Sequence, residues 1–225
     1  MKLSKFQIQS PSLYPYRLGF TAGALGVAQC HTLAALRLKL GSWNTVRKEA
    51  LAENRLFQAR RSSLVRTERE FRQRVETLTD SQIAILAESS VDVARLFALL
   101  AAFKRYAFLF DFCCLGLRPK VERHDFALRP SDYENFVATV EPSHPEFTAL
   151  SPSSRAKVRQ VALRILAEGG LLSETRRPTI LRPNLPQVFL RAVMDDTPSY
   201  LVGFLVPDAE IRKLVDTLSL SEATA

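Results

Sequence analysis

The most hydrophobic stretch of the chain, Leu96–Leu117, limits what the protein can fold into. It contains the charged residues Lys104, Arg105 and Asp111, and its longest uncharged run is Leu96–Phe103. That run is far shorter than the roughly 20 apolar residues that a helix needs to cross a bilayer. We therefore predict that the stretch is a helix buried inside a helical bundle, and that no part of it lies in a membrane.

Helical signals fill the rest of the first half, and no strand pattern of any length occurs before residue 118. Residues that cap or stop helices mark the expected boundaries. The predicted helices run from about 22 to 40, with Thr21 as cap and Gly41 as stop; from Ser42; from Thr79 to about Glu88; and from Ser89 or Ser90 to near Leu117. The first half is therefore predicted to be an α-helical bundle.

The pair Arg118-Pro119 is the expected boundary between two domains, because proline disfavours continuation of a helix. The chain of 225 residues is long enough for one large domain or two small ones. We predict a mainly α protein with a basic helical bundle over 1–118 and a smaller, mostly helical domain over 119–225.

The second half contains a pattern that resembles the helix-then-wing half of a winged helix-turn-helix, over 151–183. Ser151 and Pro152 are a strong helix start, and Gly169-Gly170 end that helix. A polar turn and a short β-prone segment follow. Outside this pattern, the expected elements are a short helix capped by Ser131, a helix near 185–193, a strand over 200–206 and a final helix over 208–218.

Seven arginines against three glutamates lie in the 25 residues from Asn54 to Leu78, which leaves a net charge of +4. Four apolar residues there recur at spacings of 7, 4 and 3 and fall on one helical face: Leu64, Phe71, Val75 and Leu78. Arg66, Arg69 and Gln73 then point away from that face. An arginine-lined face fits a phosphate, whereas the alternative is an ordinary solvated face that the glutamates balance.

Ser62 or Ser63 is expected to cap the first turn of this helix, where free backbone N–H groups also attract anions. The charge of the whole chain favours the same class of partner. Residues 1–118 carry 18 Lys and Arg against 9 Asp and Glu, whereas 119–225 carry 13 against 14. The entire excess of +8 therefore comes from the first half, which indicates contact with nucleic acid or a membrane surface there.

No common catalytic or metal-binding motif occurs in the chain. Three cysteines without framework spacing, Cys30, Cys113 and Cys114, favour reduced thiols and a cytoplasmic protein. The three histidines do not fall at metal-ligand spacing with them. The start of the chain lacks the apolar segment of a secretory signal. We therefore expect a binding protein that is not an enzyme, with no catalytic residue, metal or cofactor.

Six blocks of the sequence together resemble the BrxA proteins of bacterial BREX phage-defence islands. The blocks are LGFTAG at 18–23, LGSW at 40–43, NRLFQARRSSLVR at 54–66, KRYAF at 104–108, HPEF at 144–147 and LSPSSRAKVRQVALRILAEGGLL at 150–172. The resemblance covers about residues 16–206, and its specificity comes from the order and spacing of the blocks. It implies a mostly helical, non-catalytic DNA-binding component of a system that modifies host DNA and blocks phage.

The leading hypothesis is that the protein binds double-stranded DNA, chiefly through phosphates, together with other BREX proteins. The family pattern matches ten residues: Gln58, Arg60, Ser62, Ser63, Arg66, Arg155, Lys157, Arg159, Gln160 and Arg164. With the further arginines of each region, the predicted DNA-binding residues are Arg60, Arg61, Ser62, Ser63, Arg66, Arg69, Arg155, Lys157, Arg159, Gln160, Arg164, Arg176 and Arg177. The alternative is a protein-interaction adaptor whose basic face docks an acidic surface of another defence subunit.

Overall fold

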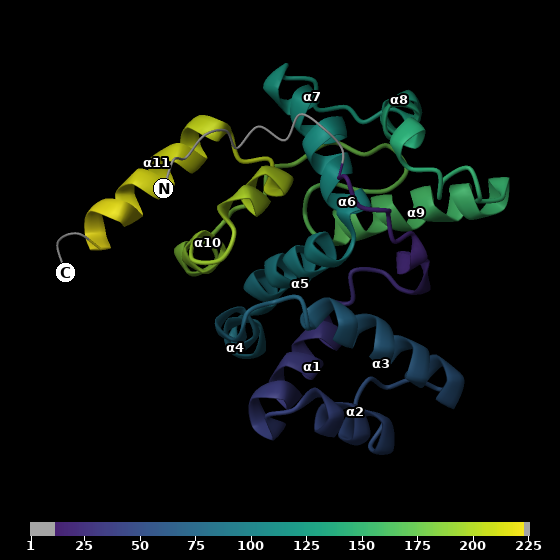
Figure 1. The fold of residues 1–225 in the computed structure, drawn as a ribbon, viewed down its shortest axis with the longest axis vertical. Helices are drawn as coiled ribbons and strands as arrows, with labels where there is room; N and C mark the ends of the chain where they lie inside the picture. Colours follow the sequence, from purple (N-terminus) through teal and green to yellow (C-terminus); the bar gives the residue numbers. More distant parts are fainter. Residues whose placement is uncertain (1–11, 223–225) are drawn as a thin grey trace.

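The computed structural model describes residues 12–222 and is mainly α-helical, as the sequence predicts (Figure 1). Residues 1–11 and 223–225 of the two predicted domains lie outside the described residues. Over 12–222 the β structure is limited to two isolated antiparallel bridges, Ala127 with Thr179 and Leu172 with Ile180. In the same range, no helix is both long enough and apolar enough to cross a membrane.

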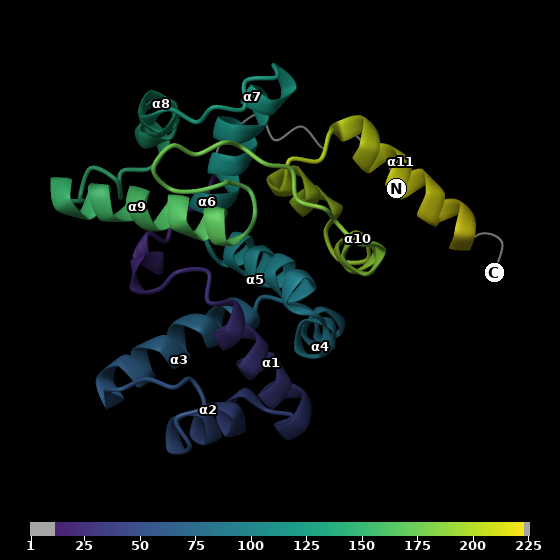
Figure 2. The ribbon, with the colours of Figure 1, turned by 180° about the vertical axis from the view of Figure 1, so that it is seen from behind.

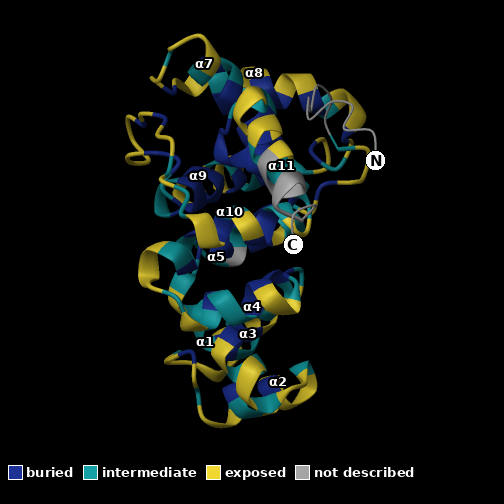
Figure 3. Cartoon of the chain, turned by 90° about the vertical axis from the view of Figure 1, so that its left-hand side faces the viewer, coloured by how far each residue is buried: buried dark blue, intermediate teal, exposed yellow. Residues whose placement is uncertain are grey.

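The first part of the chain contains η1 (Gly19–Ala22), α1 (Val27–Leu40), α2 (Trp43–Ala52), α3 (Arg61–Val75), α4 (Asp80–Glu88) and α5 (Val91–Arg105). A second helical run contains α6 (Ala107–Asp111), the π-helical turn η2 (Phe112–Leu117) and α7 (Arg118–Glu122). The last part contains α8 (Pro130–Val140), η3 (Glu141–Ser143), α9 (Pro152–Glu168), α10 (Gln187–Met194), η4 (Pro198–Phe204) and α11 (Asp208–Glu222). Helices α10 and α11 present exposed residues on the face shown in Figure 3.

Three predicted caps are confirmed. The hydroxyls of Ser42, Thr79 and Ser151 each accept a hydrogen bond of 3.2 Å from the N–H three residues on, at the starts of α2, α4 and α9. Thr79 also forms a capping box, because the side chain of Gln82 accepts a hydrogen bond from the Thr79 N–H. These starts were predictable because the signal is local to one turn.

Three other predicted caps are wrong. Helix α8 begins at Pro130, not after Ser131, and α3 begins at Arg61, before either predicted serine. Helix α1 begins after Gly26, not after Thr21, and Gly26 has a left-handed φ of 69°. A β-carbon at Gly26 would lie 2.0 Å from the Phe71 ring, so glycine there lets α3 pack against the start of α1.

The apolar face of α3 is buried as predicted, with Phe71 only 4% exposed. Arg66 and Arg69 face solvent, also as predicted. Gln73 does not: it is half-buried, and its Oε1 accepts a hydrogen bond of 2.7 Å from Arg105. The helix therefore presents a narrower exposed face than its sequence pattern predicts, because α5 covers part of it.

The predicted long apolar helix is buried but not continuous. Residues 96–103 of α5 are all buried, at the centre of the molecule (Figure 1). The helix breaks at Tyr106, which has φ −128° and ψ 87° and donates a hydrogen bond of 2.5 Å to Glu70 of α3. The run from 107 onward then continues through η2, where the wider π-helical turn brings Gly116 against the Phe112 ring.

The predicted strand over 200–206 is wrong. Residues 198–204 form η4, whose last residues are buried, and the turn ends at Leu205 in a left-handed conformation with φ 61°. Gly203 approaches Phe110 so closely that a β-carbon would lie 2.7 Å from that ring. A short apolar run indicates burial but does not distinguish a strand from a tight helical turn.

The predicted boundary at Arg118-Pro119 lies within a continuous helical run from η2 into α7. Pro119 is the second residue of α7, which follows directly after the π-helical turn. One connected core contains buried residues from both predicted domains. The division into two domains stays a prediction.

Substituting Phe71 with Ala should lower the free energy of unfolding by about 3–5 kcal/mol, because the ring is buried against the start of α1. Substituting Arg69, which is exposed on the same helix, should change it by less than about 0.5 kcal/mol. Thermal or urea unfolding of both variants measures the difference. Equal effects would show that the buried face of α3 is misassigned.

Candidate nucleic-acid interface

The first half of the predicted site lies at the start and outer face of α3. The side chains of Arg60, Arg61, Arg66 and Arg69 are exposed, as are Ser62 and Ser63. Within residues 12–222, no acidic side chain pairs with Arg60, Arg66 or Arg69. We call these six residues, with Arg47 and Lys48 of α2, the α3 basic surface.

Two residues of this surface, Arg47 and Lys48, were missed by the sequence analysis. They are exposed on α2 and line a hollow of about 510 Å³ with Asn44 and Arg61. The Arg61 guanidinium donates a hydrogen bond to the carbonyl of Leu51, which fixes the start of α3 against the end of α2. Adjacent basic residues on the polar side of an amphipathic helix were the available signal, in the sequence WNTVRKEALA.

The other arginines of α3 are structural. Arg72 bridges Glu68 and Glu76 at 2.7 and 2.6 Å. Arg74 is fully buried, and its Nη2 lies 2.8 Å from Glu70 Oε1. The three glutamates of the arginine-rich stretch therefore pair mainly with Arg72 and Arg74. Arg47 of α2 makes a longer contact, with its Nε 4.0 Å from Glu68 Oε2. The expectation that the glutamates balance the whole face does not hold for the residues at its exposed end.

The second half of the predicted site lies on α9, and three of its arginines are paired with carboxylates. The pairs are Arg155 with Glu141 at 2.5 Å, Arg159 with Glu134 at 3.0 Å, and Arg164 with Glu168 at 2.8 Å. Lys157 and Gln160 are exposed and hydrogen-bond to each other at 3.2 Å. We call these five residues, with Arg176 and Arg177, the α9 basic surface.

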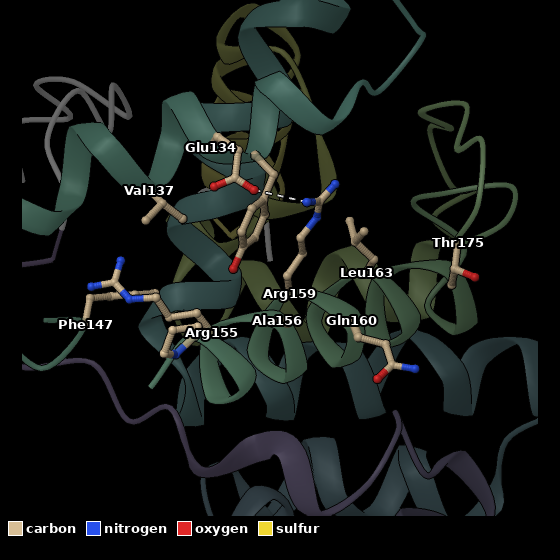
Figure 4. Close-up of a pocket in the computed structure, with 11 residues that line it drawn as sticks. Glu134, Val137, Phe147, Arg155, Ala156, Arg159, Gln160, Leu163 and Thr175 are labelled. Atoms are coloured by element: carbon tan, nitrogen blue, oxygen red, sulfur yellow. Dashed lines mark hydrogen bonds and ion pairs between the residues drawn. The ribbon is translucent and has the colours of Figure 1, made fainter. Parts of the chain in front are cut away.

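A hollow of about 570 Å³ lies between α8 and α9 (Figure 4). Its walls include Tyr133 and Glu134 of α8, Arg155 and Arg159 of α9, and Thr175 of the following loop. The Arg159 guanidinium also lies 5.4 Å from the centre of the Tyr133 ring. Burial raises the pKa of the Tyr133 hydroxyl, and the nearby Glu134 carboxylate raises it further, so the tyrosine stays neutral. The hollow is therefore lined by a neutral phenol and by arginines that are paired with glutamates.

The loop after α9 is held as a hairpin with Arg176 and Arg177 at its exposed tip. The bridge between Leu172 and Ile180 closes its base, and the Ser173 N–H donates to the Thr179 carbonyl at 3.0 Å. Thr179, in the second arm of the hairpin, forms the other bridge with Ala127, just before α8. Arg176 also lines a small hollow with Arg129 and Arg159, so the tip adjoins the α9 basic surface.

The two predicted blocks lie on helices whose N-terminal ends extend in the same direction. The N-terminal ends of α3 and α9 extend to the right in Figure 1 and to the left in the reversed view of Figure 2. The short helix η1 packs against both helices. The two basic surfaces are therefore parts of one connected structure.

The three cysteines are buried. Burial raises the pKa of the Cys30 thiol to about 12, and it also raises the pKa values of Cys113 and Cys114. All three thiols therefore stay protonated at neutral pH. Among residues 12–222, no group of three or more His, Cys, Asp or Glu side chains is arranged to hold a metal ion.

The fold and these surfaces define a mainly α-helical protein with two clusters of basic side chains. The BrxA family model matches residues 14–196, and the chain belongs to the BrxA family. Membership identifies it as a component of a BREX phage-defence system. This confirms the family that the sequence blocks indicated.

A crystal structure of an uncharacterized protein from Magnetospirillum magneticum has a similar fold. The TM-score is 0.74 with 19% sequence identity, over 85% of this chain and 98% of that chain. No curated protein matches the chain. The similarity supports the fold alone.

Replacing Arg74 with Ala should lower the free energy of unfolding by about 3–5 kcal/mol, because Glu70 is left buried without its partner. Replacing Arg66 with Ala should change it by less than about 0.5 kcal/mol. Urea unfolding distinguishes a structural arginine from a surface arginine on the same helix. Similar losses in the two variants would contradict the division.

Proposed function

We propose that the protein is a non-catalytic, double-stranded-DNA-binding component of its BREX system and grips the phosphate backbone. The observation that carries the proposal is the sorting of charges on α3: Glu68, Glu70 and Glu76 are held by Arg72 and Arg74. The arginines at the exposed end are left without acidic partners among the described residues. Guanidinium groups of this kind bind phosphate oxygens in pairs of hydrogen bonds.

The α9 basic surface is proposed to be the recognition part of a winged helix-turn-helix. The order that supports this runs from α7 through the bridge residue Ala127, α8 and α9 to the hairpin over 171–181. In such modules the second helix of the turn enters the major groove and the wing contacts the backbone. Lys157 and Gln160 of α9 would then face the duplex, and Arg176 and Arg177 would contact phosphates.

The ion pairs of α9 are compatible with this role. The side chains of Arg155, Arg159 and Arg164 are 35%, 33% and 63% exposed, so water already screens their pairs with glutamates. Exposed pairs of this kind contribute little to stability, and a phosphate can replace the carboxylate. The N-terminal ends of α3 and α9 extend in the same direction, and we propose that one duplex contacts both basic surfaces (Figure 2).

The proposal includes a cytoplasmic location and contacts with other BREX proteins. No cofactor or metal is required for backbone binding. The competing function is an adaptor that docks an acidic protein surface on the same arginines. The two functions differ in whether unrelated duplex DNA competes with an acidic partner.

Changing Arg66 and Arg69 together to Ala should flatten the plot of log affinity against log salt by roughly two units. Each phosphate contact that is lost removes about 0.9 units of slope, because fewer counterions are released on binding. Affinity should fall similarly for all duplex sequences. Fluorescence anisotropy over a salt series measures both quantities, and circular dichroism checks folding.

The matched control changes Arg191 and Arg212 together to Ala. Both are exposed, and they lie on α10 and α11, outside the two basic surfaces. The control removes the same net charge as the Arg66/Arg69 variant. Because its two arginines lie outside the proposed contacts, its salt slope should stay close to that of the parent. A folded Arg66/Arg69 variant that binds duplex with unchanged affinity and slope would contradict the proposal and favour the adaptor.

Changes in the α9 basic surface should separate backbone contacts from groove contacts. Arg176→Ala and Arg177→Ala should weaken binding to every duplex alike, because a wing contacts phosphates. Lys157→Ala or Gln160→Ala should instead change the preference among duplexes if α9 enters a groove. Selection from a random duplex library measures the preference. An unchanged preference in both α9 variants would show that this helix also contacts only backbone.

A further inference from the structure

Phe57 is a large apolar side chain that the fold leaves in solvent. It lies in the loop between α2 and α3, three residues before Arg60, and is 89% exposed. Within residues 12–222 no aromatic partner packs on its ring. A fully exposed phenylalanine gains nothing from burial in the free protein.

The backbone at Phe57 is also unfavourable for this residue. Its φ is 51°, in the left-handed region that bulky side chains rarely adopt. Asn54, with φ 45°, holds the loop in this shape: its side-chain Oδ1 accepts from the Gln58 N–H at 2.9 Å, and its Nδ2 donates to the Gln58 carbonyl at 3.0 Å. The Phe57 N–H donates to the Asn54 carbonyl at 2.9 Å.

Further bonds make the loop rigid on both sides of the ring. The Gln58 side chain donates to the Leu56 carbonyl at 3.0 Å, and Leu56 itself is buried. The loop therefore holds one apolar ring in solvent in a fixed position, although the left-handed backbone at Phe57 is energetically unfavourable. A pre-organised side chain loses little freedom on binding, so an exposed ring of this kind is suited to a partner.

The surroundings of Phe57 indicate which partner. Phe57 is close to the α3 basic surface in sequence, because Arg60 and Arg61 follow it by three and four residues. The hollow lined by Arg47 and Lys48 lies between the two helices that the loop connects. Proteins that grip a duplex through arginines and lysines also insert apolar side chains between base steps, which partly unstacks the bases and kinks the helix axis. An apolar ring among cations fits a base stack flanked by phosphates better than an acidic protein surface.

We propose that Phe57 is a wedge that inserts at a base step of duplex DNA while the α3 basic surface holds the flanking phosphates. This inference rests on the proposed function and adds a stacking contact to it. The step most easily opened is a pyrimidine–purine step such as TA, because it is the most flexible. Insertion would give the protein a preference for deformable sites without hydrogen bonds to base edges.

The test uses the full chain and a 20-base-pair duplex in which 2-aminopurine replaces adenine at a central TA step. The variants are Phe57→Gly, which removes the ring and accepts the left-handed backbone, and Phe57→Trp, which keeps an aromatic ring. Val91→Ala is the control, because Val91 is 70% exposed and lies outside both basic surfaces. Anisotropy gives the affinity and salt slope, and 2-aminopurine fluorescence reports unstacking.

The parent and Phe57→Trp should both raise the 2-aminopurine fluorescence on binding. Phe57→Gly should stay folded, lose the fluorescence change and bind about 10-fold more weakly, since stacking on one base is worth about 1–3 kcal/mol. Its salt slope should be unchanged, because no charge is removed. Val91→Ala should match the parent in every measurement.

Two results would overturn the wedge and leave duplex binding intact. One is a folded Phe57→Gly variant that matches the parent in affinity and fluorescence. The other is a parent that binds the duplex with a steep salt slope but never changes the 2-aminopurine signal. A parent that does not bind duplex at low salt is a different result, because it overturns the proposed function itself.

Discussion

The buried ion pair between Arg74 and Glu70 is the interaction on which the N-terminal half depends. The guanidinium lies between the rings of Phe71 and Tyr106, 4.8 and 5.5 Å from their centres. It donates to the carbonyls of Ala24 and Leu25, at 2.9 and 3.2 Å, which fixes the segment that enters α1. Glu70 in turn accepts a hydrogen bond from the Tyr106 hydroxyl. One charge pair thus joins α3, the start of α1 and the break after α5.

This arrangement explains how an arginine-rich helix can pack against the core while other arginines stay exposed. A buried charge needs partners, and here a carboxylate, two carbonyls and two aromatic rings surround the guanidinium. Burial raises the pKa of the Tyr106 hydroxyl to about 12, with the Glu70 carboxylate adding to the shift, so the hydroxyl remains a donor. The three glutamates of α3 and its C-cap pair with Arg72 and Arg74 in the second half of the helix. The arginines at the exposed N-terminal end keep their positive charge unpaired by acidic side chains among the described residues.

The sequence predicted features that depend on one turn or one helical face. Ser42, Thr79 and Ser151 cap their helices, and Leu64, Phe71 and Val75 face the core, because each signal is local. The break at Tyr106 and the late start of α1 at Gly26 were not predictable. Both arise from contacts with α3 across long sequence separations, and a single sequence does not state which residues meet.

The candidate site was predictable in part for the same reason. The exposed arginines of α3 follow from its periodicity, whereas Arg47 and Lys48 join them only because α2 packs beside the start of α3. The pairing of Arg155, Arg159 and Arg164 with glutamates joins α9 to η3, to α8 and to its own last turn, and only the last of these is visible as a spacing in the sequence. Phe57 lies within the block NRLFQARRSSLVR, but its exposure follows from the loop geometry and not from the sequence pattern.

The central claim is that the basic surfaces bind duplex DNA rather than an acidic protein. Competition measures this most directly: labelled random-sequence duplex is bound by the purified full chain, and unlabelled duplex or polyglutamate is added at matched charge concentration. The account predicts that unlabelled duplex displaces the label and polyglutamate does not, with log affinity falling linearly against log salt. Absence of duplex binding at low salt, or equal displacement by polyglutamate, would contradict it.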